Sequence, residues 1–143
     1  MAAETLARFR TNRSESLTIL TNGGGAGVMA ADAAAQVNVP LTELGASTLA
    51  QLDAVLPANW SHGNPVDIIG DAPVKRYGEA LQILHNDPNG AAVLFIHAPT
   101  AIVPSAEIAT ALSALPQSAT AWLMGCWLGG HGVEAARQLF KGA

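Results

Sequence analysis

The sequence predicts an α/β fold: a doubly wound, five-stranded parallel sheet of flavodoxin-like type, with strand order 2-1-3-4-5. Three observations predict it. Short apolar runs alternate with helix-like segments five times along the chain. Two of these runs, residues 91–98 and 120–127, are apolar at nearly every position, as strands are when helices cover both faces of a parallel sheet. Glycine- or proline-marked loops follow the strands, so these loops should share the carboxyl edge of the sheet, where such folds bind ligands.

Each expected element has a local signal in the sequence. Leu6 and Phe9 share one face of a short helix, which with a polar linker makes up residues 1–16, and residues 17–143 form the domain. Ser47 and Asp71 are expected to cap the helices that follow them, and Pro104 begins another. The expected strands are 17–21, 41–44, 65–69, 91–98 and 120–127, and the expected helices are 28–37, 48–55, 73–86, 104–115 and 133–140.

Composition narrows the class of protein further. The 143 residues suit one domain, and half of them are apolar while the net charge is only -4, which excludes intrinsic disorder. No apolar run is long enough for a membrane helix, and the acidic balance argues against a nucleic-acid binder. The single cysteine, Cys126, forms no internal disulfide and indicates a reducing compartment, so we expect a cytoplasmic protein. Only 13% of residues are charged, which suggests that another surface covers part of this one.

The most informative motif is the glycine-rich segment Asn22-Gly23-Gly24-Gly25-Ala26-Gly27, which precedes a helix expected to begin at Val28. Four glycines in five positions cost chain entropy, which makes sense if the backbone must approach a ligand closely. A helix N-terminus presents free N–H groups and a positive dipole end, a combination that suits phosphate. The alternative is a tight turn with close packing of helix on strand. The segment is not a P-loop because no lysine follows, and Gly25, Gly27 and Ala30 match a dinucleotide fingerprint only weakly.

Other polar or flexible residues also follow strands and would complete the rim around this segment. Asp67 lies within an apolar strand, where a carboxylate needs hydrogen bonds, and it either holds neighbouring loops or contacts a ligand. The histidines are scattered, no Gly-x-Ser-x-Gly motif is present, and no cluster has metal-ligand spacing, so neither a catalytic residue nor a metal site is assigned. The candidate residues that line the rim are Asn64, Asp67, Pro99, Thr100, Gly129 and Gly130.

Four stretches in this order resemble the C-terminal ligase domain of NDP-forming acyl-CoA synthetases, the acetyl-CoA synthetase (ADP-forming) family within the succinyl-CoA synthetase superfamily. The resemblance covers residues from about 17 to 140. The stretches are Thr21–Asp32, Asn64–Ala72, Ala98–Ala101 and Trp127–Gly130.

The resemblance implies a role in converting acyl-CoA, phosphate and NDP to acid, CoA and NTP through a phosphorylated histidine. In this family two helix N-termini, one from each of two flavodoxin-like domains, hold that phosphohistidine. Residues Asn22 to Val28 would supply one of them, and Asn64, Asp67 and Thr100 would line the same site. The Ser-His-Thr-Gly type segment that carries the histidine belongs to another domain and is absent here, so no histidine of this chain takes that role.

The resemblance also implies a larger protein, of which this chain would be one excised domain. Its sister domains would be a CoA-binding domain, a histidine-bearing domain and an ATP-grasp domain, and the whole protein would use CoA, ATP or ADP, and Mg, although this domain alone would bind none of them. Family members tend to have an acidic residue after the two glycines, where this chain has His131. Two other functions stay open: a regulatory ligase-like domain of a multidomain protein lysine acetyltransferase, and a generic nucleotide-binding module. The acyl substrate and a homo-oligomeric state also stay open.

Overall fold

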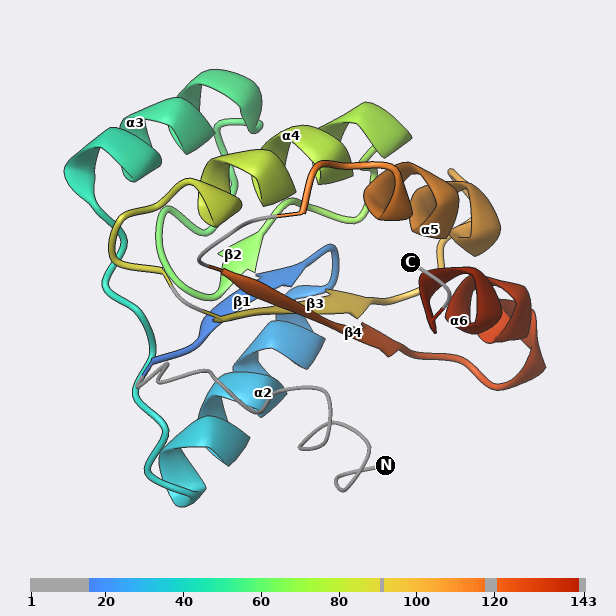
Figure 1. Cartoon of the computed structure of the whole chain (residues 1–143), viewed down its shortest axis with the longest axis horizontal. Coiled ribbons are helices and arrows are strands. Elements are labelled where there is room, and N and C mark those ends of the chain that lie inside the picture. The colour runs from blue at the N-terminus through green and yellow to red at the C-terminus, as the bar shows by residue number, and fades with distance from the viewer. Residues whose placement is uncertain (1–15, 91, 118–120, 142–143) are drawn as a thin grey trace.

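The computed structural model describes residues 16–90, 92–117 and 121–141. In this part of the chain, a parallel sheet of four strands lies between layers of helices (Figure 1). The strands are β1 (Thr18–Thr21), β2 (Val66–Asp67), β3 (Ala92–His97) and β4 (Trp122–Trp127). The helices are α2 (Gly24–Gln36), α3 (Ala46–Val55), α4 (Val74–His85), α5 (Ser105–Ser113), the 3-10 helix η1 (His131–Val133) and α6 (Glu134–Lys141). The expected helix within residues 1–16 lies outside the described residues.

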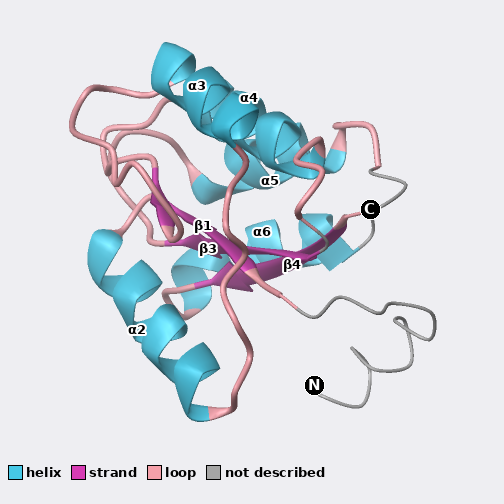
Figure 2. Cartoon of the chain, turned by 90° about the vertical axis from the view of Figure 1, so that its left-hand side faces the viewer, coloured by secondary structure: helices cyan, strands magenta, loops and turns pink. Residues whose placement is uncertain are grey.

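The core lies on one side of the sheet, beneath α3, α4 and α5, whereas α2 lies on the opposite face (Figure 2). Apolar side chains of β1 and β3, among them Leu20 and Phe95, meet the inward side of α4. Tyr77, Leu81 and Leu84 are all buried there, so the predicted inward face of this helix is confirmed. α6 packs against α5 at the side of the same layer (Figure 1).

The predicted five strands and the order 2-1-3-4-5 are not found among the described residues. The observed order is β2-β1-β3-β4, with every neighbouring pair parallel. β3 lies directly beside β1 because it is long and buried along most of its length, and the strand expected at 65–69 pairs with the other edge of β1. That strand has only two residues and follows Pro65, which has no N–H to donate, so an edge position suits it.

The strand expected at 41–44 is reduced to a single bridge between Leu41 and Leu17. The side chain of Asn64 explains this reduction. Its Nδ2 donates to the carbonyl oxygens of Leu17 (2.9 Å) and Thr42 (3.0 Å), while its Oδ1 accepts the N–H of Ile19 (3.0 Å). A side-chain amide therefore takes backbone bonds of β1 that a further strand residue would otherwise make.

Several predicted helix starts are also wrong. α2 begins at Gly24, four residues before the expected Val28, so most of the glycine-rich segment is the first helical turn and not a loop. α3 begins after Gly45, and the hydroxyl of Ser47 accepts from Gln51 Nε2 instead of capping the helix. Asp71 does not cap α4 either, because its carboxylate pairs with Arg76 at 2.6 Å.

Candidate functional site

The N-terminus of α2 presents backbone donors to which the described residues offer no hydrogen-bond acceptor. Gly23 precedes the helix with extended backbone angles, no side chain caps the helix, and its first turn holds no acidic residue. The first backbone bond of the turn runs from the N–H of Gly27 to the carbonyl of Gly23 (3.2 Å), so the N–H groups of Gly24, Gly25 and Ala26 precede the intrahelical ladder. Gly24 and Gly25 are exposed. Free donors and the positive dipole end together can bind an anion.

Three glycines of this segment are explained by close packing. A Cβ built on Gly23 would lie 3.1 Å from Ala98 Cβ, and one on Gly27 would lie 3.0 Å from Thr21 Cγ2. A Cβ on Gly24 would lie 2.8 Å from Asp67 Oδ2, too close to be tolerated without movement. A Cβ on Gly25, by contrast, would meet nothing within 4 Å. Packing therefore does not explain Gly25, which faces open space at the donor end of the helix.

Asn22 joins two loops of the rim instead of offering its side chain to a ligand. Its Nδ2 donates to the carbonyl oxygen of Ala98 (2.7 Å), and its Oδ1 accepts the N–H of the same residue (2.8 Å). The side chain is almost fully buried. Asn22 thus extends the pairing of β1 with β3 by one residue and fixes the position from which α2 starts.

Asp67 holds the neighbouring loop, as one of its two predicted roles required. Its Oδ1 accepts the N–H of Ile69 (2.9 Å), while its Oδ2 lies against Gly24. Ile69 has φ of 70°, a left-handed conformation that is rare for a β-branched residue. Arg76 secures the same loop by donating to the carbonyl of Ile68 (3.1 Å) and to Asp71. The sequence did not lead us to predict this role of Arg76. The one feature that could have indicated it is Asp71, an acidic residue five positions earlier.

Most of the remaining predicted site residues lie at the rim, and one, Asn64, does not. Pro99 and Gly129 meet at the rim, since a Cβ on Gly129 (φ 99°) would lie 3.0 Å from Pro99 Cγ. The hydroxyl of Thr100 accepts the N–H of Ile102 (3.3 Å), which makes it a turn former. Val28 is 59% exposed on the second turn of α2, and Gly130 begins the turn after β4.

Asn64 is not brought to this rim, because its side chain bonds to the first half of β1 and to Thr42.

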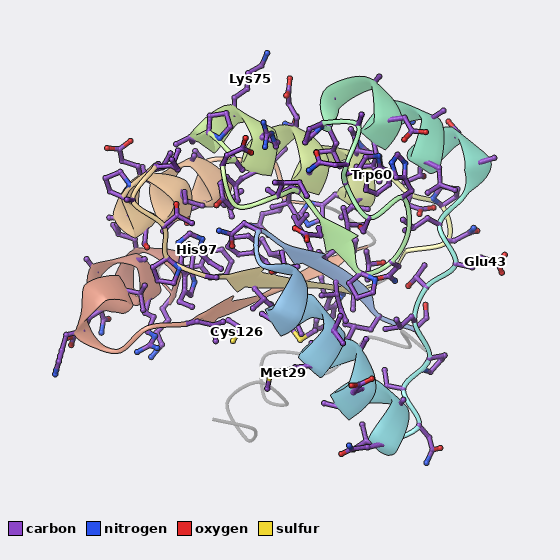
Figure 3. All side chains as sticks on the ribbon, turned by 180° about the vertical axis from the view of Figure 1, so that it is seen from behind. Met29, Glu43, Trp60, Lys75, His97 and Cys126 are labelled. Atoms are coloured by element: carbon purple, nitrogen blue, oxygen red, sulfur yellow. The ribbon has the colours of Figure 1, made fainter. Side chains whose placement is uncertain are left out.

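His97 is a buried residue for which no role is predicted from the sequence. Figure 3 shows it at the end of β3, and its Nε2 lies 2.9 Å from the hydroxyl of Ser105, the first residue of α5. Burial lowers the pKa of His97 below its ordinary value. Its Nδ1 is buried without a hydrogen-bond partner. A neutral ring that carries its proton on Nε2 donates to Ser105 and leaves no buried N–H unsatisfied at Nδ1, and this bond ties α5 to β3.

The described residues include no helix long and apolar enough to cross a membrane, and within them no three His, Cys, Asp or Glu side chains gather as metal ligands would. Fold and rim together define an α/β domain in which the N-terminus of α2 lies at the carboxyl edge of a parallel sheet. The chain belongs to the Ligase-CoA domain family, whose model matches residues 17–123.

Relatives of known activity support this assignment. An acetate–CoA ligase (ADP-forming) I of Archaeoglobus fulgidus is 38% identical over 136 residues, which are 95% of this chain and 19% of that protein. The alpha subunit of the acetate–CoA ligase (ADP-forming) I of Pyrococcus furiosus is 33% identical over 112 residues, 75% of this chain and 23% of that subunit. The chain therefore spans about a fifth of the length of these relatives.

Solved structures agree with the sequence matches. A protein of Pyrococcus horikoshii has a TM-score of 0.81 and 26% identity over 91% of this chain and 31% of its own. The dinucleotide-forming acetyl-coenzyme A synthetase 1 of Ca. Korarchaeum cryptofilum, solved in complex with phosphate and ADP, has a TM-score of 0.78 and 25% identity over 90% of this chain and 28% of its own.

Proposed function

We propose that this chain is the ligase domain of an NDP-forming acyl-CoA synthetase-like protein. Its role is to stabilise a phosphate or phosphohistidine with the N-terminus of α2 while the whole protein interconverts acyl-CoA, phosphate and NDP with acid, CoA and NTP. Sister domains supply the histidine and the sites for CoA, nucleotide and Mg, and the reducing cytoplasm suits the free thiol of Cys126.

The observation that carries this proposal is the open space around Gly25 in the first turn of α2. Glycine within a helix destabilises a protein by roughly 0.5–1 kcal/mol relative to alanine. At position 25 no neighbouring atom lies within 4 Å of where a Cβ would be, so packing does not exclude a side chain there. A side chain here would lean toward the N-terminus, as Cβ atoms do in helices, and would cover the donors of Gly24, Gly25 and Ala26. A bound phosphate gives the reason for keeping this space open.

The names of the relatives support the reaction class. The Archaeoglobus and Pyrococcus furiosus relatives are acetate–CoA ligases (ADP-forming), and one structural neighbour is an acetyl-coenzyme A synthetase solved in complex with phosphate and ADP. A preorganised set of backbone donors is suited to a phosphoryl group because it requires no rearrangement when negative charge develops.

Gly25→Val in the full-length protein tests the proposal. We expect formation of the phosphohistidine from ATP, followed with radiolabelled phosphate, to fall by a factor of about 100 or more, the range seen when a preorganised donor is lost. Gly78→Val is the matched control, since Gly78 is also a helical glycine with open space around it but lies in α4. Normal phosphoryl transfer by a folded Gly25→Val protein would overturn the role of this helix N-terminus.

A further inference from the structure

A second candidate site lies at the other end of the rim, on α6. A cavity of about 380 Å³ follows the turn after β4, and most of its lining comes from one face of this helix. The family model matches residues 17–123, so the residues that line this cavity lie outside the matched range. Its lining residues are Gly130, His131, Glu134, Arg137, Gln138 and Lys141.

The charges of the described residues single out this cavity. Lysine and arginine occur at four described positions, and two of these side chains pair with carboxylates: Lys75 with Glu79 at 3.4 Å and Arg76 with Asp71 at 2.6 Å. Arg137 and Lys141 pair with no carboxylate of the described chain, and both line the cavity. Among the described residues, the two cations without a carboxylate partner therefore line the same cavity.

The local geometry keeps these two cations side by side. Arg137 and Lys141 are four residues apart on α6, a spacing that brings them onto one face and makes like charges repel. The guanidinium of Arg137 donates through Nη2 to the carbonyl of Trp127 (2.7 Å), which anchors it at the end of β4 and leaves further N–H donors. Glu134, the one carboxylate of the lining, lies 3.6 Å from His131 Nδ1 and so engages the histidine.

We propose that this cavity binds a small anion through a carboxylate or phosphate group, with Arg137 and Lys141 as its main contacts. The planar fork of arginine matches the paired oxygens of either group, and lysine adds a second charge one turn away. An anion bound between them removes their mutual repulsion. This inference does not depend on the role proposed for α2, because it rests on different residues at a different helix.

The test follows backbone amide shifts of the 143-residue chain by NMR while inorganic phosphate, malonate or acetate is added at constant ionic strength. We expect saturable shifts at His131, Arg137 and Gln138, with phosphate or malonate binding more tightly than acetate. Tighter binding of phosphate would identify the anionic group of the ligand as a phosphate, and tighter binding of malonate would identify it as a dicarboxylate. Each of Arg137→Gln and Lys141→Gln is expected to weaken binding about tenfold, as loss of a charge-assisted contact does.

Two controls make the test decisive. Lys75→Gln removes an equal charge from α4 and should leave binding unchanged, and Gly25→Val alters α2 without touching the cavity. Lys141 makes no bond to the rest of the described chain, so Lys141→Gln gives a clear answer even if Arg137→Gln disturbs α6. Absence of saturable shifts at α6, equal weakening by Lys75→Gln, or loss of binding in Gly25→Val would overturn the proposal.

Discussion

Asn22 and Asn64 show how single side chains build the rim. A side-chain amide carries the same donor and acceptor as a peptide group, and both residues use it to bond the backbone of a neighbouring strand or loop. Asn22 extends the pairing of β1 with β3, and Asn64 takes the place of a fifth strand. Both residue types are visible in the sequence as site candidates, but which backbone groups they bond depends on strand order, which the sequence did not reveal.

The buried histidine His97 makes the stability of the protein depend on pH. Burial lowers the pKa of both His97 and His85, whereas in the unfolded chain histidine takes up a proton near pH 6.5. Below that pH the unfolded state binds more protons than the folded state, so the free energy of unfolding falls as pH decreases from about 6.5 toward the lowered pKa values. Above about 6.5 both states are neutral and this contribution is fully present.

His97→Gln tests this dependence. Glutamine keeps a donor for Ser105 but does not titrate, so we expect a smaller loss of stability between pH 7 and pH 5 than in the wild type, with His85 accounting for the rest. Urea unfolding at a series of pH values measures it. His131→Gln, at a fully exposed histidine, should keep the wild-type dependence, and an unchanged dependence in His97→Gln would contradict the argument.

At the scale of the helix, α2 contains two glycines that close packing explains, Gly24 and Gly27, and one that it does not, Gly25. Gly27→Ala places a Cβ 3.0 Å from Thr21 and 3.3 Å from Pro65, and we expect it to destabilise the chain by about 1–3 kcal/mol. Gly25→Ala has open space and a helical backbone, so it should stabilise the chain by about 0.5–1 kcal/mol. Urea unfolding of the two variants beside the wild type measures both signs, and destabilisation by Gly25→Ala would remove the reason to assign that residue to a ligand.

How far the sequence predicts these elements depends on the signal each one carries. β3, β4 and α4 are predicted to within a few residues because their apolar patterns are long and regular. The start of α2 is missed because glycine disfavours helices by propensity, whereas here Thr21, Pro65 and Asp67 lie so close to Gly24 and Gly27 that no larger residue fits without movement. The position of Pro99 and Gly129 at the rim can be predicted because each follows the carboxyl end of a strand. The loop held by Arg76 cannot, because its hydrogen bonds are tertiary contacts that the hydrophobic periodicity of the sequence does not reveal.

At the scale of the whole molecule, α2 leaves an apolar surface outside the core. Only Gly27 and Ala34 of this helix are buried, while Val28 is 59% and Met29 74% exposed. Exposed apolar side chains that gather on one element are typical of surfaces that pack against another domain. The chain spans about a fifth of the length of its relatives, and the exposed face of α2 is the surface on which we expect the sister domains proposed above to pack.

Met29→Glu tests whether this surface is an interface. The side chain is exposed, so the free energy of unfolding of the chain should change by no more than about 0.5 kcal/mol. A carboxylate buried without a partner at a domain interface is costly, so association of the variant with the separately expressed remainder of the parent protein should weaken at least tenfold. Sedimentation of the mixed components measures this loss. Gln82→Glu makes an exposed substitution on α4, across the sheet from α2, and should leave association unchanged; equal association of wild type and Met29→Glu would mean that the exposed face of α2 is not where the sister domains pack.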